Sequence, residues 1–197
     1  MTAIAAPRAT MAAMAHALPR RAADQRLRAL FRDHAAFVWR SLRRLGVPER
    51  DVADAAQRVW LVIDRNLERV SEGAERSYAF GTAMRVASEY RRADRRRRED
   101  LAATVREESV PESQRPDGLL RKREARTMLD KLLAVLDDDA RAVFVLYELE
   151  ELTTGEIARM LDVPTGTVAS RLRRAREDVQ REARRQRAID GTRGDGR

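Results

Sequence analysis

The chain has 197 residues, with 40 Lys and Arg against 32 Asp and Glu, and therefore a formal net charge of +8 and a pI near 10.9. Hydrophobic residues make up 43% of it and aromatic residues only 5%, which suits two small helical bundles better than one large core, because small domains expose proportionally more surface. With no cysteine and only two histidines, the composition excludes disulfides and thiolate metal sites and disfavours an imidazole metal site.

The excess of positive charge indicates a polyanionic partner, either nucleic acid or an anionic membrane surface. No apolar run approaches the roughly 20 residues that a transmembrane helix needs, so we expect no membrane span. Residues 1–23 are rich in Ala and Met and contain no acid. Because arginines interrupt this segment and no compact apolar core precedes a cleavage site, we expect a disordered extension and not a targeting peptide.

Residues 24–100 show three helical segments. The first has an apolar stripe at helical spacing and ends at the turn signal Gly46–Pro48, the second has its own stripe and ends before 71–77, and the third runs from about Tyr78 to Asp100. The expected core positions of the first helix are Leu27, Leu30, Phe31, Val38, Leu42 and Leu45. Those of the second helix are Val52, Ala56, Val59, Ile63 and Leu67.

Residues 101–121 lack a sustained stripe and contain Pro111 and Pro116, so we expect a linker there. A second helical domain follows at 122–187, and residues 188–197 are expected to be a disordered tail. No segment alternates apolar and polar residues with a period of two. The sequence therefore predicts an all-α fold of two small helical domains joined by a flexible linker.

The second domain contains a predicted helix-turn-helix. Thr153 stands three residues before Glu156, the spacing of a capping box that begins a short helix. A turn at 162–164 ends this helix, because Pro164 cannot continue it. Thr165 can then cap a second helix whose buried stripe is Val168, Leu172, Ala175 and Val179.

The other faces of this second helix carry hydroxyl and guanidinium groups. In a DNA-binding helix-turn-helix the start of the second helix enters the major groove, where Arg can pair with guanine and Thr or Ser can bond to phosphates or bases. The expected DNA contacts are Thr165, Thr167, Ser170, Arg171, Arg173 and Arg174. The alternative is a solvated helix whose arginines form ion pairs, Arg173 with Glu177 and Arg174 with Asp178.

The run FVLYELEELTTGEIARMLDVPTGTVASRLRRARE, residues 144–177, resembles region four of extracytoplasmic-function (ECF) sigma factors, the promoter-specificity subunits of bacterial RNA polymerase. The motif EIA at 156–158 and the motif GTV-x-SRL-x-RAR at 166–176 carry the resemblance. Three departures stand out: Asp137 replaces a usual proline, Glu151 a usual glycine, and Ala169 a frequent lysine.

The first domain resembles region two of the same family. The segment DVADAAQRVWLVI, residues 51–63, has the acid, glutamine and aromatic residue of the family's polymerase-docking helix, which implies docking roles for Asp54, Gln57 and Trp60. The segment YAFGTAMRVASEYRR, residues 78–92, resembles the part that captures and helps to melt the upstream edge of the transcription bubble. Tyr78, Arg85 and Glu89 depart from the family's usual Trp, Asn and Asp.

A basic run follows that segment, with six arginines among the eight residues 91–98. These arginines can track a phosphate backbone, and the alternative is a solvated helix end. The residues expected at the bubble-edge element are Tyr78, Arg85, Glu89, Arg91, Arg92, Arg95 and Arg96.

The resemblance implies a sigma factor that binds the two largest subunits of core RNA polymerase, reads two promoter elements and helps to open the DNA. It implies a cytoplasmic location, an anti-sigma factor as a candidate partner, and no catalytic residue, metal, cofactor or small-molecule substrate. A helix-turn-helix regulator that acts without polymerase is the alternative. An enzyme is disfavoured, because the acids at 137–139 and 148–151 lie on helices, where adjacent side chains diverge, and no histidine or phosphate-binding loop accompanies them.

Overall fold

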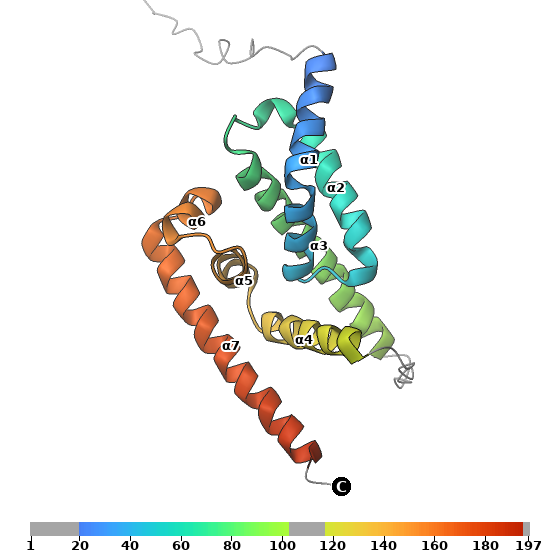
Figure 1. Ribbon diagram of the computed structural model, residues 1–197, viewed down its shortest axis with the longest axis vertical. Helices are drawn as coiled ribbons and strands as arrows, with labels where there is room; N and C mark the ends of the chain where they lie inside the picture. The colour runs from blue at the N-terminus through green and yellow to red at the C-terminus, as the bar shows by residue number, and fades with distance from the viewer. Residues whose placement is uncertain (1–19, 103–116, 195–197) are drawn as a thin grey trace, which may run out of the picture.

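The computed structural model describes residues 20–102 and 117–194, and all of their regular structure is helical (Figure 1). The first unit comprises α1 (Arg20–Arg44), α2 (Val52–Arg65) and α3 (Glu75–Ala102), with the short 3-10 turns η1 (Glu49–Asp51) and η2 (Leu67–Arg69). The second unit comprises α4 (Asp117–Ala134), α5 (Asp138–Phe144), the π-helical segment η3 (Val145–Leu149), α6 (Thr154–Leu161) and α7 (Thr165–Gly194).

The first unit is a three-helix bundle in which α1, α2 and α3 all pack against one another. The predicted α2 stripe is confirmed, because Val52, Ala56, Val59 and Ile63 are all buried. The α1 helix ends in a Schellman motif: Val47 N donates to Leu42 O at 3.0 Å and Gly46 N to Arg43 O at 2.9 Å. Gly46 adopts a φ of 91°, the left-handed conformation that this motif requires.

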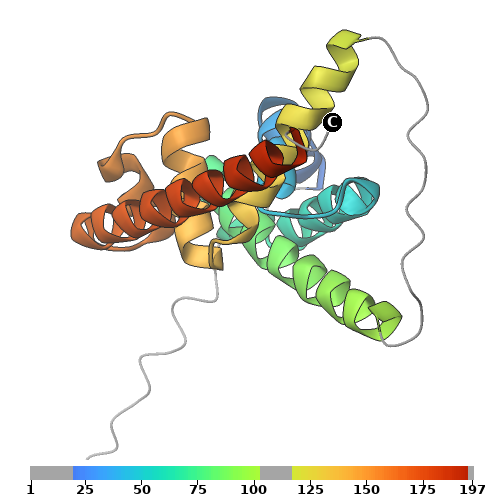
Figure 2. The ribbon, with the colours of Figure 1, turned by 90° about the horizontal axis from the view of Figure 1, so that it is seen from below.

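In the second unit α7 packs against α4, α5 and α6 (Figure 2). Asp137 caps α5 by accepting a hydrogen bond from Ala140 N at 2.7 Å. This cap satisfies an amide of the first turn of α5, as an aspartate at the N-cap commonly does. Leu133, Leu136, Ala140, Val145 and Ala175 form a small apolar cluster between these helices.

The structure differs from the sequence-based expectation at Phe31, which is 51% exposed although it was expected in the core. Its ring packs edge-on against Trp60, with the ring centroids 5.0 Å apart. Leu27 and Leu30 already supply the inward side of this part of α1, and Phe31 follows one position later, which turns its side chain toward α2 and solvent.

The helix bounds also differ from the expected domain boundaries. The α1 helix begins at Arg20, before residue 24; α4 begins at Asp117, inside the expected linker; and α7 continues to Gly194. The expected tail at 188–197 therefore starts within a helix, because residues 180–190 are mostly good helix formers and lack Gly and Pro. The rest of the expected N-terminal extension and linker, residues 1–19 and 103–116, lies outside the described residues.

The two units share one apolar core. Leu146, Ile157, Val168 and Leu172 of the second unit belong to the same buried cluster as the core of α1, α2 and α3. The α6 and α5 helices contact α3 directly. Among residues 20–102 and 117–194, no helix combines the length and apolarity needed to cross a membrane.

Candidate nucleic-acid interface

The helix-turn-helix begins with the predicted capping box, which the structure confirms. Glu156 N donates to the Thr153 hydroxyl at 3.3 Å, and Thr153 N donates to the Glu156 carboxylate at 2.8 Å. Hydrogen bonds from the Thr153 hydroxyl and amide hold the pKa of Glu156 below its usual value. These reciprocal bonds satisfy two amides at the start of α6 and fix where the helix begins.

The turn between α6 and α7 is set by Asp162 and Pro164. Asp162 caps α6 in a left-handed conformation with a φ of 53°, and Val163 N donates to Ala158 O at 3.0 Å. The α7 helix starts at Thr165, and the amides of Thr167 and Val168 both donate to the Pro164 carbonyl. Thr165 is therefore the first helical residue and not the cap that was expected, because Pro164 already supplies the first carbonyl acceptor of the helix.

The N-terminal half of α7 separates buried from exposed side chains as predicted. Val168, Leu172 and Ala175 are buried against the rest of the second unit. Of the six expected DNA contacts, the four that are exposed are Thr165, Ser170, Arg173 and Arg174. Thr167 and Arg171 are half-buried.

Three arginines of this surface are held by carboxylates of the second unit. Arg171 forms an ion pair with Asp139 of α5, and Arg174 lies 3.7 Å from Asp137, the α5 cap. Arg173 pairs with Glu177 at 2.8 Å, as the ion-pair alternative predicted. The other pair of that alternative is not formed, because Asp178 contacts Arg181 at 3.1 Å and Arg174 reaches toward α5 instead.

A second candidate surface lies along α3. Five of the expected bubble-edge residues follow one another at spacings of seven, four, three and four, which places them on one side of a helix with 3.6 residues per turn. They are Tyr78, Arg85, Glu89, Arg92 and Arg96, and we call them the α3 stripe. Tyr78 is half-buried and the other four are exposed. Glu89 pairs with Arg58 of α2 at 2.6 Å, and a hollow of about 500 Å³ lies beside them, lined also by Tyr90, Arg92, Ala93 and Arg96.

Arg91 and Arg95 lie off this stripe. Arg91 donates to the Leu45 carbonyl and forms an ion pair with Asp138 of the second unit. Burial lowers the pKa of Arg91 from its ordinary value, and the nearby Asp138 opposes that effect. Arg95 lines a different cleft, at the junction of the two units. The structure thus places Arg91 in a contact between units, which sequence reasoning did not foresee.

The expected docking residues gather on the outer face of α2. Asp54 and Gln57 are exposed, and Trp60 is half-buried against Phe31. Leu61, at helical spacing from Gln57, is 48% exposed and extends this face. Sequence reasoning missed Phe31 and Leu61, because Phe31 fits the apolar stripe of α1 and a single leucine in an apolar run carries no signal of exposure.

A capped helix-turn-helix with an arginine-rich recognition helix, joined to a basic helical bundle, defines a helical DNA-binding protein. The family model described as "Sigma-70, region 4" matches residues 126–179. The ECF RNA polymerase sigma-E factor of Escherichia coli (strain K12) is 31% identical over 141 residues, which cover 68% of this chain and 74% of that protein. The ECF RNA polymerase sigma factor SigL of Mycobacterium tuberculosis is 30% identical over 153 residues, covering 74% and 82%. The chain belongs to the ECF sigma factors of bacterial RNA polymerase.

Two solved structures share the fold. CnrH, in complex with the cytosolic domain of CnrY, superimposes with a TM-score of 0.56 at 21% identity and covers 86% of this chain and 92% of CnrH. The sigma factor RpoE of Bartonella quintana, in complex with the anti-sigma factor NepR, gives a TM-score of 0.51 at 20% identity, covering 78% and 96%. These matches extend over both units, so the similarity includes the first unit as well as the helix-turn-helix.

Proposed function

We propose that this sigma factor directs core RNA polymerase to promoters by reading two DNA elements with two separate surfaces. The N-terminal half of α7 reads the upstream element, the α3 stripe holds the edge of the melted region, and the outer face of α2 docks on polymerase. The observation that carries the proposal is that each group of side chains stands exposed on a helix of its own within a chain of this family.

The α7 surface is suited to reading base edges in duplex DNA. Ser170, Arg173 and Arg174 are exposed on the side of α7 away from its buried stripe. Their positions near the helix N-terminus match those from which recognition helices contact bases in the major groove. Arginine can donate two parallel hydrogen bonds to guanine, and each such pair discriminates by about 1–3 kcal/mol against the wrong base.

The α3 stripe is suited to DNA that is being opened. Unstacking a base costs a few kcal/mol, and stacking on an aromatic side chain together with phosphate contacts can repay it. Tyr78 supplies an aromatic ring at one end of the stripe, and Arg85, Arg92 and Arg96 supply positive charge along it. The hollow beside Glu89 is lined partly by polar side chains and lies next to the positive charge of Arg92 and Arg96.

The outer face of α2 is suited to protein docking, because Asp54 and Gln57 provide polar contacts beside the apolar pair Phe31 and Trp60. Its partner is core polymerase, which places the chain in the cytoplasm and leaves all bond chemistry to the polymerase. An anti-sigma factor is a further candidate partner, as the RpoE of Bartonella quintana was solved with one.

The test is run-off transcription from a promoter library with core polymerase, in the presence and absence of the chain. We expect initiation at a subset of promoters only when the chain is present. A variant with Asp54→Ala and Gln57→Ala should lose core polymerase in a pull-down while it still binds duplex DNA. The control is Asp24→Ala with Gln25→Ala, which alters an exposed acid and an exposed glutamine near the start of α1. If the chain binds a palindromic operator tightly and directs no initiation, the regulator alternative is correct instead.

A further inference from the structure

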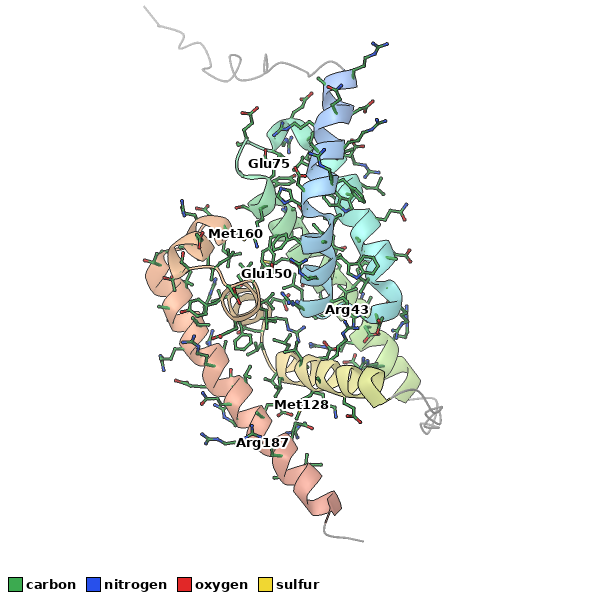
Figure 3. All side chains as sticks on the ribbon, viewed as in Figure 1. Arg43, Glu75, Met128, Glu150, Met160 and Arg187 are labelled. Carbon is green, nitrogen blue, oxygen red and sulfur yellow. The ribbon has the colours of Figure 1, made fainter. Side chains whose placement is uncertain are left out.

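A cleft lies where the end of α1 meets α3, α4 and α5, and we call it the junction cleft. Arg43 marks its position, between the end of α1 and α4 (Figure 3). Its volume is about 390 Å³, within the range of roughly 300–1,000 Å³ that is usual for sites of small ligands. Six arginines and three acids line it. This excess of arginine favours an anionic ligand.

Two of the six arginines are balanced by acids of the same cleft. Arg43 pairs with Glu49 at 2.7 Å. Arg98 pairs with Asp94 at 2.9 Å, and Arg50 also contacts that aspartate. The charges of Arg43 and Arg98 are therefore offset inside the protein and add little attraction for a ligand.

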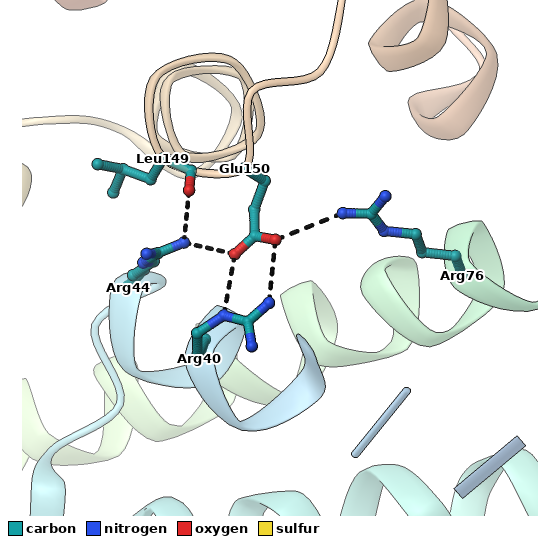
Figure 4. A network of polar contacts seen from close by, with 5 residues as sticks. All are labelled: Arg40, Arg44, Arg76, Leu149 and Glu150. Carbon is teal, nitrogen blue, oxygen red and sulfur yellow. Dashed lines mark hydrogen bonds and ion pairs between the residues drawn. The ribbon is translucent and has the colours of Figure 1, made fainter. Parts of the chain in front are cut away.

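Arg44 is balanced by an acid outside the cleft. The Glu150 side chain, which is only 6% exposed, accepts hydrogen bonds from three arginines of the first unit: Arg40, Arg44 and Arg76 (Figure 4). Arg44 also donates to the Leu149 carbonyl at 3.0 Å. The guanidinium group of Arg44 is thus already engaged by the second unit.

The other three arginines follow one another along one side of the cleft. Arg141 of α5 is only 4% exposed, and it donates to the Leu133 carbonyl at 2.8 Å and to the Leu45 carbonyl at 3.0 Å. Arg91 of α3 donates to the same Leu45 carbonyl. Burial, and next the charge of Arg91, lower the pKa of Arg141 to about 10. Arg95 lies one helical turn after Arg91, and its charge adds to the effect of burial in lowering the pKa of Arg91.

This row of three positive charges has a single carboxylate partner. Arg91 forms an ion pair with Asp138, whereas neither Arg95 nor Arg141 forms one with any residue of 20–102 or 117–194. The two carbonyls that Arg141 contacts occupy only part of the N–H donors of a guanidinium group. A buried charge without a counter-ion is costly. The row therefore leaves the charges of Arg95 and Arg141 uncompensated.

We propose that the junction cleft binds a phosphate dianion, either free or as the phosphate group of a small monoester, between Arg95 and Arg141. A phosphate monoester carries about 1.5 to 2 negative charges at pH 7, which matches two uncompensated guanidinium groups. The planar fork of N–H donors on arginine also suits the oxygens of phosphate.

The apolar part of the lining favours the monoester over the free ion. Val47, Pro48, Leu133 and Ala134 line the cleft beside the arginines, and they offer a surface for the organic part of a ligand. Sites for small molecules commonly combine such apolar walls with a few polar groups. A bound monoester would stabilise the folded chain by mass action. This inference goes beyond promoter reading and gives Arg95 a ligand other than DNA.

Binding is tested by isothermal titration calorimetry of the full chain at fixed ionic strength, with adenosine monophosphate (AMP), inorganic phosphate and dimethyl phosphate as probes. We expect one molecule of AMP or phosphate to bind per chain, and dimethyl phosphate, which has one charge, to bind about tenfold more weakly or less. Tighter binding of AMP supports a monoester as the ligand, and equal binding of inorganic phosphate supports the free ion. No saturable binding of either, or equal binding of dimethyl phosphate, would overturn the proposal.

The first variant is Arg95→Gln, which should weaken the binding of AMP and phosphate about tenfold, because it removes one of the two uncompensated charges. Arg97→Gln is the matched control, since it makes the same change two positions later on α3, at an exposed residue outside the cleft lining. Both positions are exposed, so neither change should disturb the fold. An equal loss in both variants would show that only net charge matters and would contradict a defined site.

A change at Asp130 should act in the opposite direction. Asp130 lines the cleft and forms no ion pair with the parts of the chain that the structure describes. Burial raises the pKa of Asp130, although arginines nearby, such as Arg43 and Arg141, oppose that effect. Asp130→Asn removes a carboxylate that repels the ligand, so it should tighten phosphate binding several-fold. Glu124→Gln, at an exposed position of the same helix, should leave the affinity unchanged. Weaker binding in Asp130→Asn would count against an anion site.

The buried charge is tested with Arg141→Met, which keeps much of the side-chain volume. A variant that retains its helical circular dichroism should lose the binding of AMP and phosphate; retained binding would overturn the proposal. If the variant does not fold, Arg95→Gln and Asp130→Asn decide. A random-sequence duplex is then added to the complex with AMP. Displacement of AMP by the duplex would assign the cleft to DNA and overturn a small ligand, whereas simultaneous binding supports a separate site.

Discussion

The two arginine surfaces of this protein are built differently. On α7, the guanidinium groups of Arg171, Arg173 and Arg174 each lie within 4.0 Å of a carboxylate of their own unit. On the α3 stripe, Arg85, Arg92 and Arg96 form no ion pair with any part of the chain that the structure describes. Arginine side chains thus have a carboxylate neighbour on one helix and none on the other.

This difference matches the two tasks proposed for them. Recognition of a base edge needs a donor in a fixed place, and a carboxylate neighbour limits the rotamers that an arginine samples. Attraction of a phosphate backbone needs uncompensated charge more than it needs fixed geometry. The comparison predicts that α7 carries most of the sequence specificity and that the α3 stripe carries much of the salt-dependent affinity.

The largest effect is expected when the stripe loses its charge. Arg85→Gln, Arg92→Gln and Arg96→Gln together should reduce the slope of log K against log salt for random-sequence DNA by about 3, roughly one for each phosphate contact. Fluorescence anisotropy over a salt series measures this slope. The control makes the same replacement at three exposed arginines elsewhere on the first unit, Arg28, Arg65 and Arg69. An equal loss in both triple variants would show that only net charge matters.

The next effect concerns specificity on α7. The upstream element is first identified as the sequence that the unaltered chain selects from a random duplex library. The double variant Ser170→Ala with Arg174→Ala should weaken binding to this element by about 1–3 kcal/mol. Binding to random DNA should weaken much less. Competition assays with both duplexes give the ratio of specific to random binding. Arg187→Ala, on the exposed distal half of α7 (Figure 3), should leave this ratio unchanged. A uniform loss on both duplexes would reassign these residues to the phosphate backbone.

A smaller change is expected when Arg171 loses its partner. Asp139→Asn removes a negative charge near the DNA surface, so affinity for random DNA should rise a few-fold. It also releases Arg171 from its ion pair, and the ratio of specific to random binding should therefore fall. A rise in affinity for random DNA together with a fall in the ratio of specific to random binding would show that Asp139 positions Arg171 as well as contributing charge. If the affinity for random DNA and the ratio of specific to random binding both rise, the Asp139 carboxylate acts only by repelling DNA.

The smallest effect is a gain of stability with no change in DNA binding. Glu151 adopts a φ of 57° just before α6, and a side chain in this left-handed conformation costs about 1 kcal/mol. Glu151→Gly should therefore raise the free energy of unfolding by up to about 1 kcal/mol, less the entropy that glycine adds to the unfolded chain. Thermal and urea unfolding measure it. A loss of stability would show that the Glu151 side chain makes a favourable interaction that outweighs the strain.

Local features of the fold could be predicted from the sequence. The capping box at Thr153 and Glu156, the buried stripe of α2 and the exposed face of α7 follow from spacing alone, because they depend on residues within a few positions of each other. The left-handed Glu151 explains why glycine is usual at that position in the family. The order of the helices and the helix-turn-helix were also predicted correctly, because they too depend on residues close together in the sequence.

Contacts between the units could not be predicted. Arg91 lies in a run of arginines that all resemble solvent or phosphate contacts, and nothing nearby in the sequence distinguishes it from Arg92. Arg141 finds its partner at Leu45, directly after α1, and Glu150 finds Arg40 of α1, each about a hundred residues earlier in the chain. Such pairs depend on how two finished bundles meet, which the periodicity of either bundle does not encode.

One of these contacts limits how the protein can be recombined. A Cβ atom at Gly46 would lie 2.0 Å from the Arg141 guanidinium and 3.0 Å from Cδ of Arg91. The turn after α1 is therefore shaped by a residue of the other unit as well as by its own backbone. A chimera that joins the first unit of this sigma factor to the second unit of a relative should assemble well only if the glycine and the arginine are inherited together, so the two halves are not freely exchangeable modules.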